Sequence, residues 1–243
     1  MTLRRSPVAA RAAFALVACI ALAGATTKPS QSNIKSIGII AALGDTCMFE
    51  RVTDAPFQWI APPQAHFLEI SDWGIDDDIA ADIAKFLGKR YLVQSIPIEH
   101  QDFDTWSYVS LARHIRELPL PAERVDAYLV VLRDWRADEI GGSDHQVGGL
   151  GLYQRDLRGR GERLGVFASY RLVLVDPDNG NVIASQPALL PNGRMLWLSA
   201  TPALWPHTQN ELSDAQHRAL QTDFRKLIEA TLPRALQRLG LLF

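Results

Sequence analysis

The stretch that decides the fold is "YRLVLVDPDNGNVIAS", Tyr170–Ser185, in the last third of the chain. Its two ends are rich in aliphatic and β-branched residues, whereas its centre holds acidic residues, a proline and a glycine. Pro177 fixes the φ angle that suits the second position of a turn, and Gly180 accepts a positive φ where the chain rejoins a ladder. The stretch therefore predicts two antiparallel strands joined by a tight turn.

The acidic centre of this stretch also invites comparison with a calcium-binding loop. Counted from Asp176, an EF-hand loop needs Asp or Asn at positions three and five, Gly at six and Glu at twelve. Asp178 fits the third position, but the fifth is Gly180 and the twelfth is Pro187. The bidentate carboxylate is missing, so the pattern favours the hairpin.

Upstream of the hairpin, strand and helix patterns alternate. Strand patterns occur at Ile34–Leu43, Arg90–Ile98 and Val125–Trp135, and the first is the almost wholly apolar run typical of a strand covered on both faces. Between them lie two helical patterns, the first with Asp76 and Asp77 as candidate caps, the second with a buried stripe that ends at Ile115. His66–Trp73 alternates and predicts a further strand. This order implies a partly parallel sheet with helices packed against it.

The second half of the chain predicts an antiparallel meander followed by a helix. Three strand patterns separated by short loops are "QVGGLGLYQRD", "GVFASYRLVLV" and "NVIASQPAL". Ser213 and Gln216 have the spacing of a capping box, and Pro233 is expected to end this helix and begin a short last one. The predicted fold is α/β (α+β), a mixed sheet with an N-terminal βαβαβ part, a C-terminal antiparallel meander and a C-terminal helix.

The strand–turn–strand Tyr170–Ser185 resembles a hairpin found near the end of envelope α/β domains. The families are the curli-secretion lipoproteins and the amino-terminal domain of the Tol translocation protein. In those domains the hairpin lies beside a parallel βαβ part, which is the element order predicted above. The resemblance implies a fold and no activity, because one fold hosts many functions.

The amino terminus has the pattern of an export signal. Arg4, Arg5 and Arg11 precede the small and apolar run Ala12–Ala25, which ends in a small-x-small triplet. At about 14 residues this run is too short for a bilayer, which needs roughly 20. We therefore expect a signal peptide at residues 1–25, a polar tether at 26–33 and a single domain at 34–243, located in the periplasm or secreted.

A second interpretation of the amino terminus remains open. Leu16–Cys19 resembles a lipobox, in which the cysteine carries a lipid, although the residues that follow Cys19 stay apolar. This alternative predicts an outer-membrane lipoprotein anchored at Cys19, with no other membrane contact.

Charge and cysteine content exclude several classes of function. Without residues 1–25 the chain holds 22 basic and 27 acidic residues, a net charge of about −5. Such a balance offers no general attraction for nucleic acid or for an anionic membrane. Cys47 is then the only cysteine, so no disulfide within the domain is possible, and we expect a small buried side chain.

One candidate site follows from the strand order. Residues just after parallel strands gather at one edge of a sheet, where α/β proteins bind ligands. Asp45, His100 and Asp102 occupy such positions and have the side chains of a divalent-metal site. The alternative is that they are solvated residues of loop tips.

A second candidate site lies in the glycine-rich stretch Gly141–Gly151, which we expect to be a flexible loop leading into a strand. Ser143, Asp144 and His145 are candidate binding residues there, although adjacent residues do not make a catalytic triad. A third group holds Arg155, Arg158 and Arg160 around a predicted hairpin tip, where guanidinium groups could bind phosphate or carboxylate.

These patterns predict an exported bacterial cell-envelope binding or assembly module without catalytic machinery and without a cofactor. Its expected partner is an envelope protein or a cell-wall or outer-membrane component. The alternative is a metal-assisted periplasmic hydrolase that uses the Asp/His cluster at the strand carboxyl ends.

Overall fold

The computed structural model describes residues 33–53, 64–98, 110–118, 124–137, 139–140, 145–157, 161–206 and 212–243. The helices are α1 (Ile75–Leu87), α2 (Leu111–Glu117) and α3 (Asp214–Arg238), with 3-10 turns at Ser71–Trp73 and Pro202–Leu204. The strands are β1 (Ser36–Ala42), β2 (Thr46–Thr53), β3 (Gln64–Glu69), β4 (Leu92–Ser95), β5 (Ala127–Arg133), β6 (Trp135–Ala137), β7 (Gln146–Leu157), β8 (Gly161–Val175), β9 (Val182–Pro187) and β10 (Trp197–Ser199).

All these strands belong to one mixed sheet whose main order is β3-β2-β7-β8-β5-β1-β4. Strand β1 lies between β4 and β5 and is parallel to both, as the predicted βαβαβ order requires. Strands β7, β8 and β9 form the predicted antiparallel meander. The predicted fold class is confirmed.

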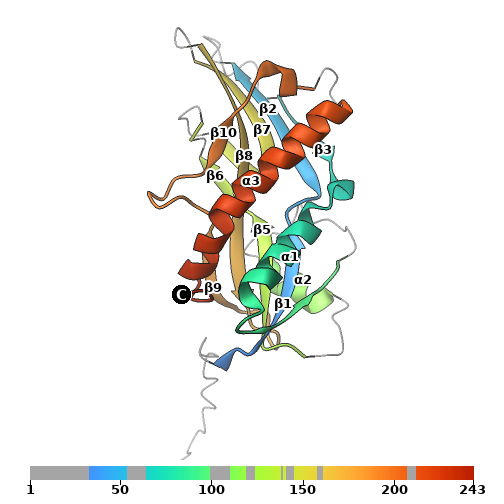
Figure 1. Cartoon of the computed structure of the whole chain (residues 1–243), viewed down its shortest axis with the longest axis vertical. Coiled ribbons are helices and arrows are strands. Elements are labelled where there is room, and N and C mark those ends of the chain that lie inside the picture. Colours follow the sequence, from blue (N-terminus) through green and yellow to red (C-terminus); the bar gives the residue numbers. More distant parts are fainter. Residues whose placement is uncertain are drawn as a thin grey trace, which may run out of the picture.

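Strand β8 is 15 residues long and is shared by two half-sheets. Its first part, Gly161–Ser169, pairs with β7, and its second part, Tyr170–Val175, pairs with β5. On its other edge, the first part pairs with β10 and the second part pairs with β9. The lower half-sheet therefore contains β4, β1 and β5, and the upper half-sheet contains β2, β3 and β7 (Figure 1).

Strand β2 was not predicted from the sequence, and it changes the interpretation of the region after β1. It begins four positions after β1 ends, pairs in parallel with β7 and carries β3 on its other side. The strand expected at His66–Trp73 is correct only as far as Glu69, because Ser71–Trp73 forms a 3-10 turn.

The hairpin predicted at Tyr170–Ser185 is confirmed. The amide of Asp176 donates to the carbonyl of Asn181 at 2.9 Å, and one Asp176 carboxylate oxygen accepts from the amide of Asp178 at 2.8 Å. Gly180 has a φ of 71°, the value for which a glycine was expected. The acidic side chains of this turn thus satisfy the backbone of the turn itself.

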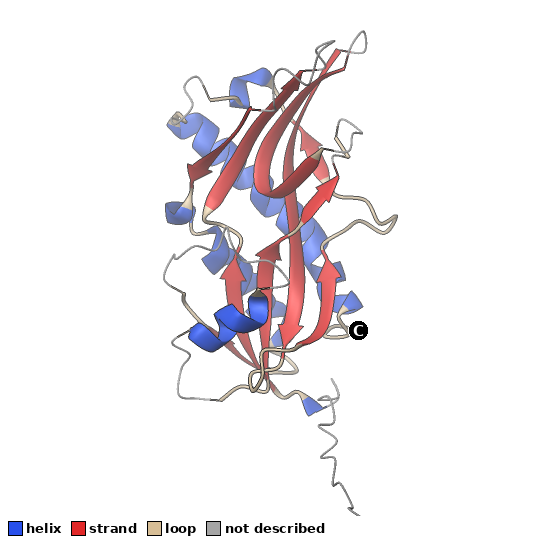
Figure 2. Cartoon of the chain, turned by 180° about the vertical axis from the view of Figure 1, so that it is seen from behind, coloured by secondary structure: helices blue, strands red, loops and turns tan. Residues whose placement is uncertain are grey.

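Helices cover the two faces of the sheet differently. Helices α1 and α3 lie on one face, and α3 crosses the sheet diagonally over both half-sheets, whereas α2 lies on the opposite face of the lower half-sheet (Figures 1 and 2). Alternate residues of β8 therefore face different layers. Those in the main core on the α3 side are Leu164, Val166, Ala168, Tyr170, Leu172 and Leu174. Each such buried aliphatic side chain contributes roughly 1.5–3 kcal/mol relative to exposure.

The long helix α3 confirms one expectation and corrects another. Ser213 and Gln216 form the predicted capping box, in which each side chain accepts from the backbone of the other. Pro233 does not end the helix, which continues to Arg238 before Gly240 turns the chain with a φ of 74°. A proline removes one helical hydrogen bond, but Leu232 and Leu236 on either side are fully buried against the sheet and hold the helix in place.

Among the described residues, no helix has both the length and the hydropathy needed to cross a membrane. Cys47 is buried as expected, and this burial raises the pKa of its thiol far above the ordinary value. A neutral, enclosed thiol is a packing residue.

The close approach of β7 to its neighbours yields a stability prediction. A Cβ atom on Gly151 would lie 2.4 Å from Cζ of Phe167 and 2.6 Å from the carbonyl oxygen of Met48. Gly151→Ala should therefore lower the free energy of unfolding by about 2–3 kcal/mol, the cost of overpacking a core. Gly161→Ala is the control, since no atom lies within 4 Å of its Cβ and only its positive φ opposes the change. Denaturant unfolding measures both, and equal midpoints for Gly151→Ala and the unmodified chain would contradict the packing described.

The start of β5 is tied to the start of β1 by one carboxylate, which gives a pH prediction. Asp126 accepts from the amides of Lys35 at 2.8 Å and Ser36 at 2.9 Å, and these bonds hold its pKa below the ordinary value. Because the folded pKa is the lower one, this stabilisation is complete above the unfolded pKa of about 3.9 and is lost as the pH falls through the folded pKa. Asp126→Asn should thus destabilise the fold at pH 7, and its difference from the unmodified chain should shrink towards pH 3 in thermal melts. A stability difference between the two chains that grows on acidification would refute this role of Asp126.

Candidate functional site

The structure describes three of the candidate site residues, Asp45, His145 and Arg155. The others, His100, Asp102, Ser143, Asp144, Arg158 and Arg160, lie outside the described residues, as does the amino terminus with Cys19. The metal site and the binding loop, each taken as a complete group, therefore stay predictions.

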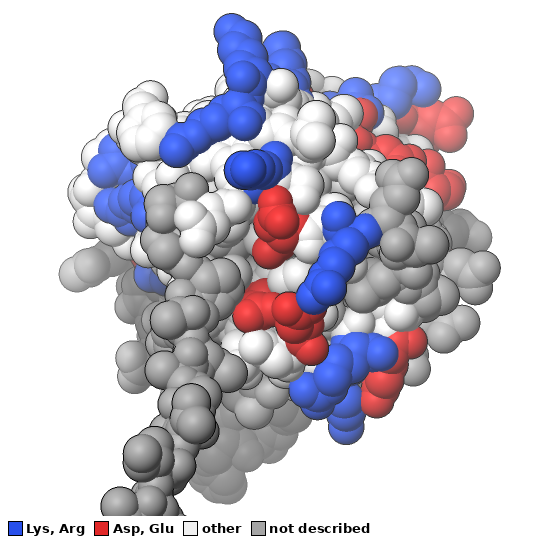
Figure 3. Space-filling model, turned by 90° about the horizontal axis from the view of Figure 1, so that it is seen from below, with Lys and Arg blue, Asp and Glu red and all other residues white. Residues whose placement is uncertain are grey.

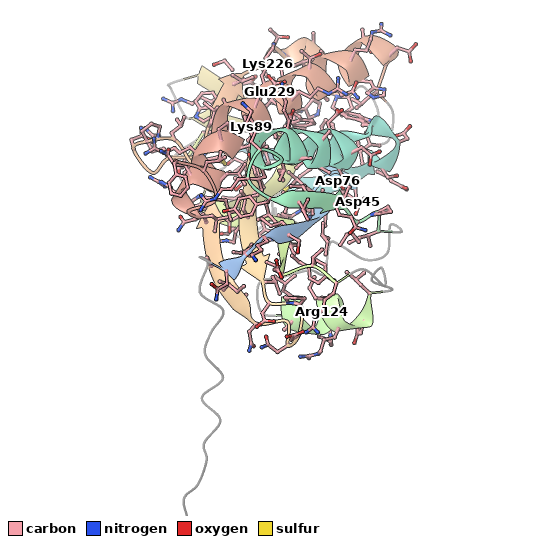
Figure 4. All side chains as sticks on the ribbon, turned by 60° about the horizontal axis from the view of Figure 1, so that its bottom comes forward. Asp45, Asp76, Lys89, Arg124, Lys226 and Glu229 are labelled. Atoms are coloured by element: carbon pink, nitrogen blue, oxygen red, sulfur yellow. The ribbon has the colours of Figure 1, made fainter. Side chains whose placement is uncertain are left out.

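A hollow of about 200 Å³ lies at the carboxyl edge of the parallel strands. The end of β1, the end of β4 and the start of α1 line it, with Gly44, Ser95 and Asp76 among its residues. Figure 4 shows Asp45 and Asp76 beside each other at this edge. The hollow thus lies at the edge where the strand order predicts a site.

Asp76 uses its carboxylate in a way that the sequence did not predict. One carboxylate oxygen accepts from the amides of Leu43 and Gly44, both at 3.0 Å. Helix α1 begins after Gly74 without a side-chain cap, so neither Asp76 nor Asp77 is the expected cap. Asp76 instead fixes the short connection between β1 and β2, and its charge also lies at the favourable amino-terminal end of α1.

Among the His, Cys, Asp and Glu side chains of the described residues, no group of three is placed to hold a metal ion. Asp76 and Asp77 line the hollow, whereas Asp45 follows the lining residue Gly44 and does not line it itself. The hollow as described offers polar groups around a small volume and no metal centre.

His145 is fixed against a buried carboxylate. Its Nε2 is paired with Oε1 of Glu50, whose side chain is only 2% exposed, and its ring stacks on Tyr153 with centroids 6.1 Å apart. A carboxylate at such depth is stable only with a partner, so this pair holds the start of β7 against β2. Sequence reasoning missed Glu50 because it missed β2.

The strand predicted from Gln146 onwards is confirmed as β7, and it contains the last glycines of the stretch Gly141–Gly151, which are therefore not part of a loop before the strand. Gly148, Gly149 and Gly151 belong to this strand, which begins at Gln146. A Cβ atom would lie 2.7 Å from the Trp135 ring at Gly148 and 2.5 Å from Nε of Arg133 at Gly149. The missing side chains thus make room for two large ones, which is a common reason for glycine within a strand.

Arg155 lies within the β7–β8 ladder, opposite Arg163. Arg163 donates to the carbonyl of Ile140 at 3.0 Å, and the neighbouring Gln154 bridges Arg51 and Glu162 at 2.8 and 2.9 Å. Two neighbours of Arg155 in this ladder, Arg163 and Gln154, are thus engaged in polar contacts within the sheet.

The most exposed aromatic surface of the upper half-sheet was not predicted. Phe67 is 45% exposed and Trp135 is 50% exposed, and the guanidinium of Arg133 lies 5.6 Å and 5.9 Å from their ring centroids. Arg133 is also hydrogen-bonded to the hydroxyl of Thr46. We call Phe67, Arg133 and Trp135 the aromatic patch. It joins the edge strand β3 to the junction of the two half-sheets.

The outer side of β3 is an open edge within the described part of the chain. The amide of Ile70 donates to Asp45 at 2.9 Å, so the β3 residues of even number direct their amides towards β2. The amides and carbonyls of Ala65, Phe67 and Glu69 then point outwards, and all three residues are exposed. No described strand pairs with this side.

Asp76 gives the prediction for this site. Asp76→Ala leaves the amides of Leu43 and Gly44 without their acceptor and should lower the free energy of unfolding by about 2 kcal/mol. Asp77→Ala is the matched control, because Asp77 is exposed, lies in the same first turn and should cost about 0.5 kcal/mol through the helix dipole alone. Denaturant unfolding of both variants measures the difference, and equal losses would refute the role given to Asp76.

The chain shares only distant similarity with known proteins. No protein-family model matches the sequence, and no curated protein matches it. Among solved structures, protein XCC0632 from Xanthomonas campestris, of family model DUF330, matches 82% of this chain and 79% of its own at 9% identity, with a TM-score of 0.32. The PelC dodecamer from Paraburkholderia phytofirmans matches 84% of this chain and 91% of its own at 11% identity, with a TM-score of 0.25. Lipoprotein GNA1162 from Neisseria meningitidis matches 80% of this chain and 99% of its own at 11% identity, with a TM-score of 0.25. These likenesses are distant, and the resemblance to curli-secretion and Tol domains stays a prediction.

Proposed function

We propose that the chain is an exported binding module of the bacterial cell envelope that takes an extended segment of a partner protein onto the outer edge of β3. The observation that carries the proposal is the combination of an open strand edge with the aromatic patch beside it. The export signal at residues 1–25 supports the location outside the cytoplasm. The role is one of binding, and it assigns no chemical step to the protein.

Backbone pairing would supply the affinity. An extended peptide added to a sheet edge forms hydrogen bonds with outward amides and carbonyls, here those of Ala65, Phe67 and Glu69. An exposed edge strand is a liability for unwanted pairing, and proteins ordinarily cover or charge it. Glu69 is the acidic residue of β3 in the part of the chain described, and Phe67 exposes a large apolar ring instead of a charge.

Side-chain contacts would supply the specificity. Aromatic and arginine side chains are the types that contribute most to protein interfaces, because they bury large rigid surfaces and also form polar contacts. Phe67 and Trp135 offer half-exposed rings, and Arg133 places a positive charge between them. The complementary segment carries apolar side chains on the side that faces the rings and an acidic side chain near Arg133.

A proline at position 65 tests pairing at the outer edge of β3 without disturbing the pairing of β3 with β2. The Ala65 amide points away from β2, so Ala65→Pro removes one outward donor while the pairing with β2 remains, as is normal for proline on an edge strand. We expect Ala65→Pro and Trp135→Ala each to reduce cross-linking of the exported full chain at least tenfold. A photoreactive residue at position 69 in intact cells measures this, with mass spectrometry to identify the cross-linked segment.

Three controls make the result decisive. Phe243→Ser changes an exposed ring at the other end of the molecule and should leave the cross-link unchanged. His66→Pro removes an amide that points to β2 and should unfold the upper half-sheet, which circular dichroism detects. A photoreactive residue at the exposed position 218 should give no such product. Equal cross-linking with and without Ala65→Pro would sink the proposal.

A further inference from the structure

The end of the molecule at which the described chain begins carries exposed apolar and basic side chains together. Asn33 and the start of β1 lie at this lower end, and the carboxyl-terminal residues return to it (Figure 1). Leu92 is 77% exposed and Phe243 is 94% exposed, which makes them the two most exposed large apolar side chains of the described chain. Lys35, Lys89 and Arg90 are exposed beside them, and we call these five residues the basal patch.

Direct contacts show that the members of the basal patch are neighbours in space. The Arg90 guanidinium lies 4.2 Å from the ring centroid of Phe243 and 5.2 Å from that of Tyr91. The amide of Leu92 donates to the carbonyl of Lys35 at 2.8 Å, which joins the first residues of β4 to the residue before β1. The patch is therefore held on the lower end of the sheet by backbone pairing and ring contacts.

The local charge of this patch differs in sign from that of the chain. The chain has a formal net charge of −2, whereas the three charged members of the patch are all basic. An acidic group, Asp126, lies directly beside Lys35, and its carboxylate accepts from the backbone amides of Lys35 and Ser36. Farther along this end, Arg124 and Asp178 pair with each other. Figure 3 shows this end from below, with basic side chains interspersed with acidic ones around white surface.

We propose that the basal patch rests on the headgroup surface of an anionic phospholipid membrane. Lysine and arginine attract anionic headgroups, while neighbouring apolar side chains enter the interface. The chain outside the structure supports this occupant. Residues 1–32 join the domain at Asn33, and they include the candidate lipid site Cys19. Fourteen positions separate Cys19 from Asn33, so a lipid there would lie within about 50 Å of the patch.

The chemistry of the basal patch disfavours a second copy as its occupant. Two copies meeting at this end would place Lys89 and Arg90 of one against the same residues of the other, and like charges across an interface are unfavourable. A membrane surface with anionic headgroups has the opposite charge and needs no shaped groove. The inference is independent of the proposed partner on β3, because that edge lies in the upper half-sheet.

Vesicle binding tests the inference. The full-length gene with Cys19→Ser is expressed, the exported chain is purified, and its processed amino terminus is verified by mass spectrometry, so that no lipid contributes. We expect cosedimentation with vesicles of phosphatidylglycerol and phosphatidylethanolamine at least tenfold stronger than with phosphatidylcholine vesicles at 0.05 M salt. Binding should weaken at 0.5 M salt, where screening is stronger. Each basic residue near such a surface accounts for about fivefold in binding.

Variants at opposite ends of the molecule make the outcome specific. Lys89→Glu combined with Arg90→Glu should reduce binding to the anionic vesicles at least tenfold, and Leu92→Ser combined with Phe243→Ser should weaken it at both salt concentrations. Arg218→Glu, an exposed change at the other end of α3, is the matched control and should bind like the unmodified chain. Equal binding to both vesicle types, or equal loss with Arg218→Glu, would overturn the inference. A dimer in sedimentation that Arg90→Glu dissociates, without vesicle binding, would assign the patch to a second copy instead.

Discussion

The continuity of strand β8 is the constraint on which the rest of the structure depends. One uninterrupted strand of 15 residues pairs with β7 through its first part and with β5 through its second. Two half-sheets of different character therefore share a single backbone, and neither can rotate against the other without breaking this ladder. Helix α3 reinforces the connection, because it packs along β8 and the hydroxyl of Tyr170 is hydrogen-bonded to that of Thr231 on α3 at 2.8 Å. Burial raises the pKa of this tyrosine, so its hydroxyl stays neutral and can donate.

Polar side chains fix the points at which the half-sheets meet, and this explains why several candidate functional residues are structural. Asp76 holds the connection between β1 and β2, and Glu50 with His145 holds β2 against the start of β7. Buried polar groups of this kind are costly unless satisfied, and once satisfied they favour one arrangement of the chain. In a freestanding α/β sheet, the carboxyl edge of the parallel strands is open to ligands. Here β1 continues almost directly into β2, so much of that edge is the junction itself.

Local chemistry decided which parts of the fold could be predicted. The turn at Asp176–Gly180 and the capping box at Ser213 are encoded by residues only a few positions apart, and both are confirmed. The apolar runs of β1 and β5 are likewise self-evident. Strand β2 was missed because Glu50 and Arg51 interrupt its apolar pattern, and their partners His145 and Gln154 lie about a hundred positions away. The break expected at Pro233 failed for a similar reason, since packing of the neighbouring leucines outweighs one lost hydrogen bond. For the candidate site, strand order indicated only the edge of the sheet that the hollow occupies, and not the contacts of the individual residues. The exposure of Phe67 and Trp135 depends on which strand lies at the sheet edge, and sequence periodicity does not contain that information.

The two proposed surfaces follow from the same elongated architecture. A two-tier sheet has two ends, and in this chain the ends differ in chemistry. The lower end joins the segment that carries the predicted export signal and exposes Lys89, Arg90 and Phe243. The upper half-sheet exposes β3 with the aromatic patch. If the basal patch faces the membrane, the shared strand β8 holds the β3 edge at a fixed height above it. A rigid connection of this kind limits the positions that a partner segment must search, which lowers the entropic cost of its binding. Continuity of β8 thus connects the fold to both proposed contacts.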